Sequence, residues 1–225
     1  MATIYPSYVK TPVDCDCRDI EGTDYRLRYV LNVELENACS NSNRLLYILM
    51  NPSVANESIS DKTVNKCAHH AFHDLKHLEI GSFSIVNIHP FYESNSLELQ
   101  PILTNLKSNF PEKYLESMNC NLKTIHQAIK ESHEIFLCTG NVPKSIINKR
   151  EYRSLVRSVH SYIESESREV YLVKGDRNQR WYGDGHLSHH LNPKVGRINK
   201  AKKHGIKNNK FTDLPDEPEV NLSIY

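Results

Sequence analysis

Four short apolar runs, rich in β-branched and aromatic residues, stand out along the chain between polar or turn residues. They span residues 45–50, 83–88, 135–138 and 170–173. Such runs are typical of strands that are buried on both faces of a parallel sheet. Apolar residues with helical spacing lie between them, and they predict helices over residues 61–78, 115–132 and 149–164. Ser60 or Asp61 is a suitable N-cap for the first helix.

Strands that alternate with helices predict crossover connections and a sheet that is covered by helices on both faces. We therefore expect an α/β fold, a single domain with a mostly parallel central sheet, over residues 25–211. Residues 1–24 are predicted to be an N-terminal extension and residues 212–225 an acidic C-terminal tail.

Polar residues follow each of the four apolar runs. Since the carboxyl ends of parallel strands meet at one edge of a sheet, and ligands bind outside that edge, these residues are the first candidates for a functional site. The segments are Asn51-Pro52-Ser53, Asn87-Ile88-His89-Pro90, Thr139-Gly140-Asn141 and Lys174-Gly175-Asp176.

The two asparagines, Asn51 and Asn87, suit a hydrolytic site. The carbonyl oxygen of an amide side chain can orient a water, and an amide offers a donor and an acceptor side by side, as the pairing edge of a flipped pyrimidine requires. The structural alternatives are a turn at Asn51-Pro52 and a loop-capping role for Asn87.

Residues 181–193 concentrate the chain's single tryptophan and three histidines in a segment that has the composition of a loop. An imidazole there could donate a hydrogen bond to a carbonyl oxygen that gains negative charge as a base departs. Metal binding is the alternative, but only His186 and His190 have i, i+4 spacing, so no metal site is predicted.

Overall composition gives few constraints on the partner. Hydrophobic residues make up 39% and charged residues 24% of the 225 residues, with 28 basic against 27 acidic side chains. Residues 194–210 hold seven Lys and Arg and no acid, so this block either contacts phosphates or forms a solvated surface. The six cysteines form no CxxC pair and are expected to be reduced thiols. With no signal-like or membrane-spanning run, we expect a soluble cytoplasmic monomer without a membrane partner.

The motifs in their order resemble an uncharacterised bacterial family, DUF1643, which carries a Met-Leu-Asn-Pro-Ser motif and is itself similar to the uracil-DNA glycosylase superfamily. The resemblance rests on Leu49-Met50-Asn51-Pro52-Ser53, on Asp61-Lys62-Thr63, on Val86-Asn87-Ile88 and on residues 185–191, Gly-His-Leu-Ser-His-His-Leu. It implies a glycosylase-like fold in which Asn51 orients the hydrolytic water, Asn87 recognises the base and His189 stabilises the departing base. His190 stands where the family has proline.

The resulting hypothesis is a DNA glycosylase that needs no cofactor and leaves an abasic site. Ser53 and its neighbours are small, which suits a bulky modified pyrimidine such as the glucosylated cytosine of some phage DNA, and hence a role in antiviral defence. A non-catalytic nucleic-acid or nucleotide binding module and a nucleoside hydrolase are the alternatives. Other side chains expected to contact DNA, by stacking or by binding phosphates, are Phe91, Tyr92, Trp181, Arg177, Arg180, Lys194 and Arg197.

Overall fold

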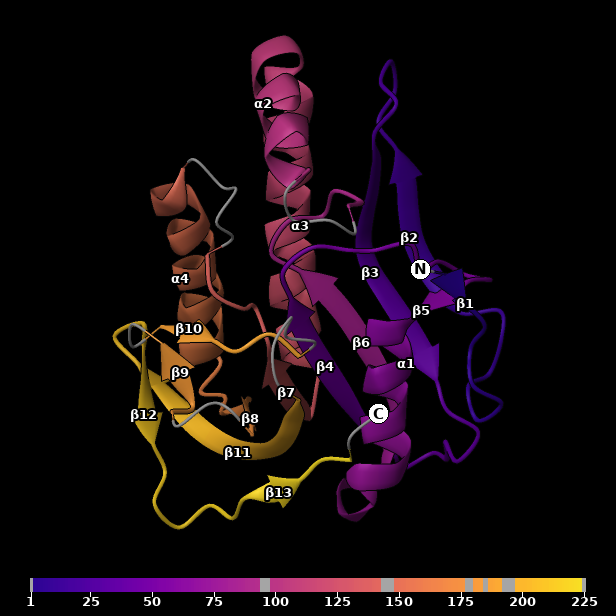
Figure 1. Cartoon of the computed structure of the whole chain (residues 1–225), viewed down its shortest axis with the longest axis vertical. Helices are drawn as coiled ribbons and strands as arrows, with labels where there is room; N and C mark the ends of the chain where they lie inside the picture. The colour runs from indigo at the N-terminus through magenta and orange to yellow at the C-terminus, as the bar shows by residue number, and fades with distance from the viewer. Residues whose placement is uncertain are drawn as a thin grey trace.

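The computed structural model describes residues 2–93, 98–142, 148–176, 180–183, 186–191 and 197–223. Its main feature is a nine-stranded sheet with the order β12-β11-β8-β7-β4-β6-β3-β2, in which β13 also pairs with β11 (Figure 1). These strands are β2 (Asp14–Asp19), β3 (Arg26–Glu34), β4 (Asn43–Leu49), β6 (Ile80–Asn87), β7 (Glu134–Leu137), β8 (Val170–Gly175), β11 (Ile198–Lys207), β12 (Lys210–Asp213) and β13 (Val220–Asn221).

The four predicted strands are confirmed as β4, β6, β7 and β8 at the centre of the sheet. They pair in parallel, β6 with β4, β4 with β7 and β7 with β8. Two further pairs of short strands lie outside the main sheet: β1 (Ala2–Thr3) with β5 (Ser60–Asp61), and β9 (Tyr182–Gly183) with β10 (Leu187–Ser188).

The expectation of a mostly parallel sheet is wrong, because every pairing outside these central strands is antiparallel. These outer strands are not continuous apolar runs. In β11, Ile198, Ala201 and His204 are buried among lysines that are partly or fully exposed, and β2, Asp-Cys-Asp-Cys-Arg-Asp, has no buried residue. Antiparallel strands can leave one face in water, so they need no continuous apolar run. Their sequences therefore resemble those of loops.

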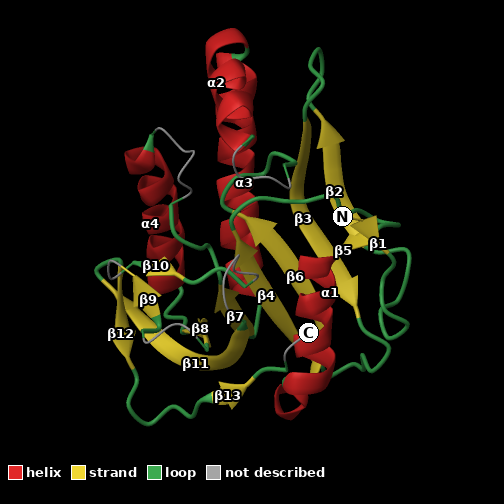
Figure 2. Ribbon diagram, in the orientation of Figure 1, coloured by secondary structure: helices red, strands yellow, loops and turns green. Residues whose placement is uncertain are grey.

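Helices cover both faces of the sheet, as the alternation of elements predicts (Figure 2). The helices are α1 (Lys62–His69) with the short π- and 3-10-helical turns η1 (His70–Asp74) and η2 (Lys76–Leu78), then α2 (Leu99–Asn109), α3 (Pro111–Glu131) and α4 (Lys149–Ser165). Asp61 caps α1, accepting hydrogen bonds from the backbone nitrogens of Thr63 (2.7 Å) and Val64 (2.9 Å). The predicted N-cap is therefore confirmed.

Successive residues of β4 point into two different hydrophobic cores. Leu45, Tyr47 and Leu49 pack with the cluster that includes α1, whereas Leu46 and Ile48 pack with the cluster that includes α2, α3 and α4. All five side chains are at most 4% exposed. This double burial is why the run is apolar at every position rather than alternating.

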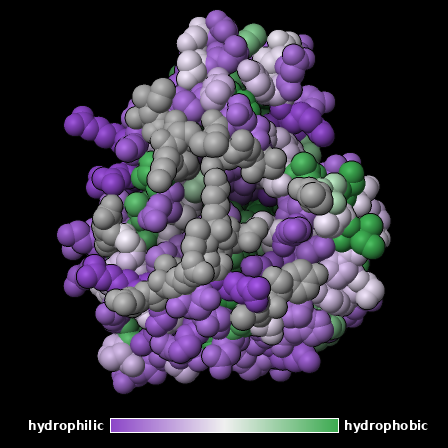
Figure 3. Space-filling view, in the orientation of Figure 1, coloured by the Kyte–Doolittle hydropathy of each residue, from purple (hydrophilic) through white to green (hydrophobic). Residues whose placement is uncertain are grey.

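Both ends of the chain contribute to the fold. From residues 1–24 the strand β2 pairs with β3, and from residues 212–225 the strand β13 pairs with β11. The face shown in Figure 3 is mainly hydrophilic, with hydrophobic side chains gathered on the side where β1 lies in Figure 1. None of the described helices is long and apolar enough to cross a lipid bilayer.

Candidate functional site

The candidate site lies where the central strands end. In the β4–β6 pair, Leu49 is opposite Asn87. The pairing continues beyond the strands, since the backbone nitrogen of Ile88 donates to the carbonyl of Leu49 (2.9 Å) and that of His89 to the carbonyl of Met50 (3.0 Å). Asn51 and Asn87 are therefore held at the ends of adjacent strands, as the sequence predicts.

Asn51 is half-buried, and its side-chain nitrogen is already engaged. The Nδ2 atom donates to the backbone carbonyl of Glu93, whose own nitrogen donates to the carbonyl of Pro52 (3.0 Å). Because the nitrogen is held by that carbonyl, the amide oxygen Oδ1 is the atom that can accept a hydrogen bond from a water.

Asn87 is fully buried and has a fixed orientation. Its Oδ1 accepts a hydrogen bond from Nη2 of Arg28 (3.0 Å), and its backbone carbonyl accepts one from Nδ2 of Asn121 (2.9 Å). A guanidinium only donates, so Arg28 determines which end of the amide faces it. The Nδ2 donor of Asn87 has no hydrogen-bond partner among the described residues.

Arg28, from β3, is the functional candidate that the sequence analysis missed. It is 2% exposed, and none of the described carboxylates forms an ion pair with it. Its Nη1 donates to the carbonyl of Ala55 (3.1 Å), which also accepts from the hydroxyl of Tyr92 (2.9 Å). Burial lowers the pKa of Arg28, but a guanidinium remains protonated at neutral pH. Arg28 therefore connects the segment after Asn51 to Asn87 through a buried positive charge.

Residues 186–191, which contain the three histidines, lie across the end of β7. The backbone nitrogen of Thr139 donates to Oγ of Ser188 (2.9 Å), and this anchors the segment to the strand. A Cβ added to Gly140 would lie 3.1 Å from Cε of Met50 and 3.3 Å from Cβ of His190. His190 is thus close to the ends of both β4 and β7.

His189, which is predicted to be catalytic, contacts the backbone of Arg180. Its Nε2 donates to the backbone carbonyl of Arg180 (2.8 Å). The contacts beside Met50 and Gly140 are instead made by the next residue, His190. A sequence comparison by position alone could not distinguish the two imidazoles.

The remaining predicted residues are dispersed. Phe91 is fully buried and stacks on Tyr114, with 5.9 Å between ring centroids, so its ring belongs to the hydrophobic core. The ammonium group of Lys174 lies over the ring of Trp181, 4.2 Å from the ring centroid.

Three other predicted residues lie at or near the strand ends. Ser53 is half-buried there. The hydroxyl of Tyr92 donates a hydrogen bond to the carbonyl of Ala55, as described above. The backbone nitrogen of Arg197 donates to Oδ1 of Asp176 (3.0 Å). Arg177 and Lys194 lie outside the described residues.

Part of the basic block is neutralised within the fold. Nζ of Lys200 lies 2.5 Å from Oε2 of Glu219, and Nζ of Lys203 lies 3.1 Å from Oε2 of Glu134. These lysines project from β11 and belong to the sheet rather than to a separate tail. Their ion pairs reduce the positive charge that this strand can present to phosphates.

His89 makes the stability of the folded state depend on pH. It is fully buried against Tyr152, and burial lowers its pKa from 6.5 to about 4, while Glu151 raises the pKa and Lys107 lowers it by smaller amounts. Between these values the unfolded chain binds more protons than the folded one, so the free energy of unfolding falls on acidification through this range.

We expect His89→Leu to reduce the loss of stability between pH 6.5 and pH 4, measured by urea denaturation across that range. The pKa values of His70 and His160 are lowered similarly, so these histidines still contribute to the pH dependence of stability in the variant. His77→Leu, at an exposed position, is the matched control and should keep the full dependence. Equal slopes for His89→Leu and the unmodified chain would show that His89 is not protonated on unfolding.

Comparison with known proteins identifies the family. The model of a family described as a protein of unknown function, DUF1643, matches residues 28–191. The chain belongs to this family. The expected membership of DUF1643 is confirmed, and the matched segment includes Arg28, Asn51, Asn87 and both candidate histidines. No curated protein and no solved structure matches the chain.

Proposed function

We propose that this DUF1643 protein is a DNA glycosylase, which releases a base by hydrolysing its N-glycosidic bond. The observation that carries the proposal is the pair of amides at adjacent strand ends, in which Arg28 fixes Asn87 and its Nδ2 donor has no partner among the residues that the structure describes. A base oxygen or ring nitrogen is a suitable acceptor for that donor. The glycosylase-like fold is part of the same proposal.

In the proposed reaction, a water held by Oδ1 of Asn51 attacks the anomeric carbon of the sugar. The bond between that carbon and the base nitrogen breaks, a carbon–oxygen bond replaces it, and negative charge moves onto the base. An imidazole that donates a hydrogen bond to the departing base stabilises this charge. His190, beside Met50 and Gly140, is placed for that role, and His189 is the alternative donor.

Because Asn87 is fully buried, the proposal requires the site to open when a base enters. Ser53 is half-buried, Ala55 is buried and Val54 is 40% exposed, so the side chains that this segment contributes to the rim are small. We propose that the substrate is a pyrimidine with a bulky substituent, as in glucosylated phage DNA, which would place the protein in antiviral defence. A cytoplasmic location fits this role.

One observation favours a nucleoside hydrolase as the second candidate. Lys200 and Lys203 are ion-paired within the sheet, so β11 presents less positive charge for a DNA backbone than the sequence suggests. A free nucleoside needs no extended phosphate-binding surface, whereas a DNA strand does.

The test is to incubate the protein with DNA that contains uracil, a mismatch or glucosylated 5-hydroxymethylcytosine, and separately with free nucleosides. We expect alkali-labile abasic sites in the glucosylated DNA and a matching amount of free base by mass spectrometry. Release from nucleosides alone would establish the second candidate. Binding to DNA without release of any base would contradict both enzymatic proposals and support a binding module.

A further inference from the structure

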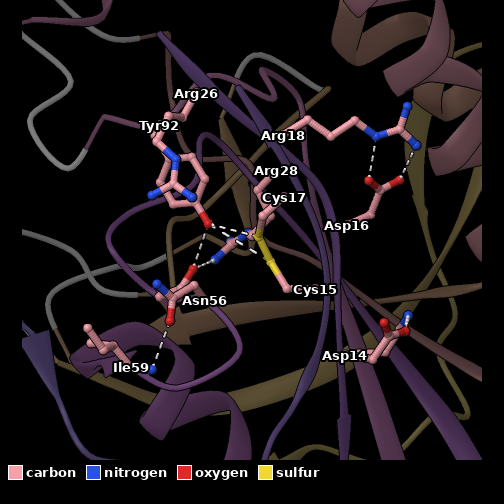
Figure 4. Close-up of a disulfide and its surroundings, with 12 residues drawn as sticks. Asp14, Cys15, Asp16, Cys17, Arg18, Arg26, Arg28, Asn56, Ile59 and Tyr92 are labelled. Carbon is pink, nitrogen blue, oxygen red and sulfur yellow. Dashed lines mark hydrogen bonds and ion pairs between the residues drawn. A yellow bond between two sulfur atoms is a disulfide. The ribbon is translucent and has the colours of Figure 1, made fainter. Parts of the chain in front are cut away.

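Cys15 and Cys17, which the proposed reaction does not use, lie side by side (Figure 4), and the carboxylate of Glu57 lies close to both. Both cysteines lie on β2, two residues apart, so their side chains leave the same face of the strand. The two sulfur atoms and a carboxylate oxygen of Glu57 all lie within 4.8 Å of one another. Contrary to the expectation of reduced thiols, the two sulfurs are joined as a disulfide.

The loop that carries Glu57 is fixed relative to β2. The backbone nitrogen of Val13 donates to the carbonyl of Glu57 (3.0 Å), and the hydroxyl of Tyr5 donates to the carbonyl of Asn56 (2.6 Å). The Oδ1 of Asn56 in turn accepts from the nitrogens of Ser58 (3.0 Å) and Ile59 (2.9 Å). The carboxylate is therefore held beside the sulfurs by the backbone around it.

The composition of this cluster suits a metal better than a purely redox role. A carboxylate beside two thiols disfavours thiolate formation by charge repulsion, but two thiolates and a carboxylate are established zinc ligands. The hydroxyl of Tyr92 lies 3.1 Å from Sγ of Cys17 and 4.0 Å from Sγ of Cys15, and by turning away from the carbonyl of Ala55 it can donate its hydrogen bond to a coordinating thiolate.

The charge of the surroundings agrees with this interpretation. Two thiolates and the carboxylate of Glu57 carry three negative charges, and a divalent ion leaves one of them uncompensated. Arg28 lies directly opposite Cys17 in the β2–β3 register, and none of the described carboxylates forms an ion pair with it. The buried guanidinium therefore supplies the remaining positive charge.

We propose that the reduced protein binds one Zn²⁺ ion through Cys15, Cys17 and Glu57, with a water in the fourth position. Dithiothreitol reduces the disulfide to two thiols and is itself oxidised to its cyclic disulfide. The two thiols then release two protons as they bind the ion. The disulfide and the metal site are alternative states of the same residues.

The test uses the full chain, reduced with dithiothreitol, desalted without oxygen and titrated with Zn²⁺ against a chromophoric chelator. We expect one zinc per chain, and Co²⁺ in its place should give a thiolate-to-cobalt charge-transfer band. Cys15→Ser and Glu57→Gln should each weaken binding, by at least about 100-fold and about 10-fold respectively. Glu57 is exposed, so its substitution leaves the core intact.

Cys39→Ser removes an exposed free thiol and is the matched control, which should bind zinc like the unmodified chain. Protein in the disulfide form should bind none. The proposal is overturned if the reduced chain binds no zinc, if Cys39→Ser weakens binding as much as Cys15→Ser, or if the oxidised chain binds equally well. None of these outcomes depends on whether the protein removes bases.

Discussion

Asn51→Ala is expected to slow base release by about 100- to 10,000-fold, the range over which a positioned group that orients or activates a nucleophile contributes to hydrolysis. Alanine removes the oxygen that would hold the water, whereas Arg28 and Asn87 keep their mutual hydrogen bond. Binding of a substrate strand should therefore be retained. Single-turnover assays on the DNA from which the base-release test shows release, together with a filter-binding measurement, separate the two effects.

Asn119→Ala, at an exposed position of α3, is the matched control and should leave turnover unchanged. Loss of the hydrogen bond from Asn51 to Glu93 also perturbs the loop, so the melting temperature of both variants needs to be compared. If Asn51→Ala has normal stability and turns over as fast as the unmodified chain, Asn51 does not hold the hydrolytic water.

Arg28→Ala is expected to lower the free energy of unfolding by about 3 kcal/mol. It leaves the Oδ1 of Asn87 without its donor, at about 1–3 kcal/mol for a buried acceptor, removes one of the two donors to the carbonyl of Ala55, and leaves a cavity. Relief of the desolvated charge offsets part of this loss. Urea denaturation followed by circular dichroism gives the value.

Arg18→Ala removes an exposed arginine from the neighbouring strand, where it pairs with Asp16, and should change stability by less than about 0.5 kcal/mol. Arg28→Lys is expected to lie between the two, because an ammonium group cannot reproduce the planar fork that reaches both acceptors. Equal stabilities for Arg28→Ala and Arg18→Ala would mean that the cost of burying the guanidinium cancels its hydrogen bonds.

The centre of the sheet could be predicted from the sequence because its strands are buried on both faces. Leu45–Leu49 has no polar interruption, and the residues that follow it are polar where the strand reaches the rim. Three of the helices and the cap at Asp61 follow from the same kind of local signal. The placement of Asn51 and Asn87 on one edge then follows from parallel pairing alone.

The outer strands and the buried charge could not be predicted in this way. Lysines along β11 look like a solvated segment because the acids that neutralise them, Glu134 and Glu219, are far away in sequence. Arg28 lies between two apolar neighbours in a strand, and nothing local shows that the opposite face of that strand is also buried. Its partners come from segments 27 and 59 residues away.

The antiparallel strands on either side of the sheet cover edges that a shorter chain would expose. The segment that defines the family, residues 28–191, excludes β2 at one side and β11, β12 and β13 at the other. An excised piece of that length would present β3 and the apolar β8 as unprotected edges, with backbone groups open to pairing between molecules. By pairing with β3 and β8, the strands β2 and β11 thus protect the sheet against self-association.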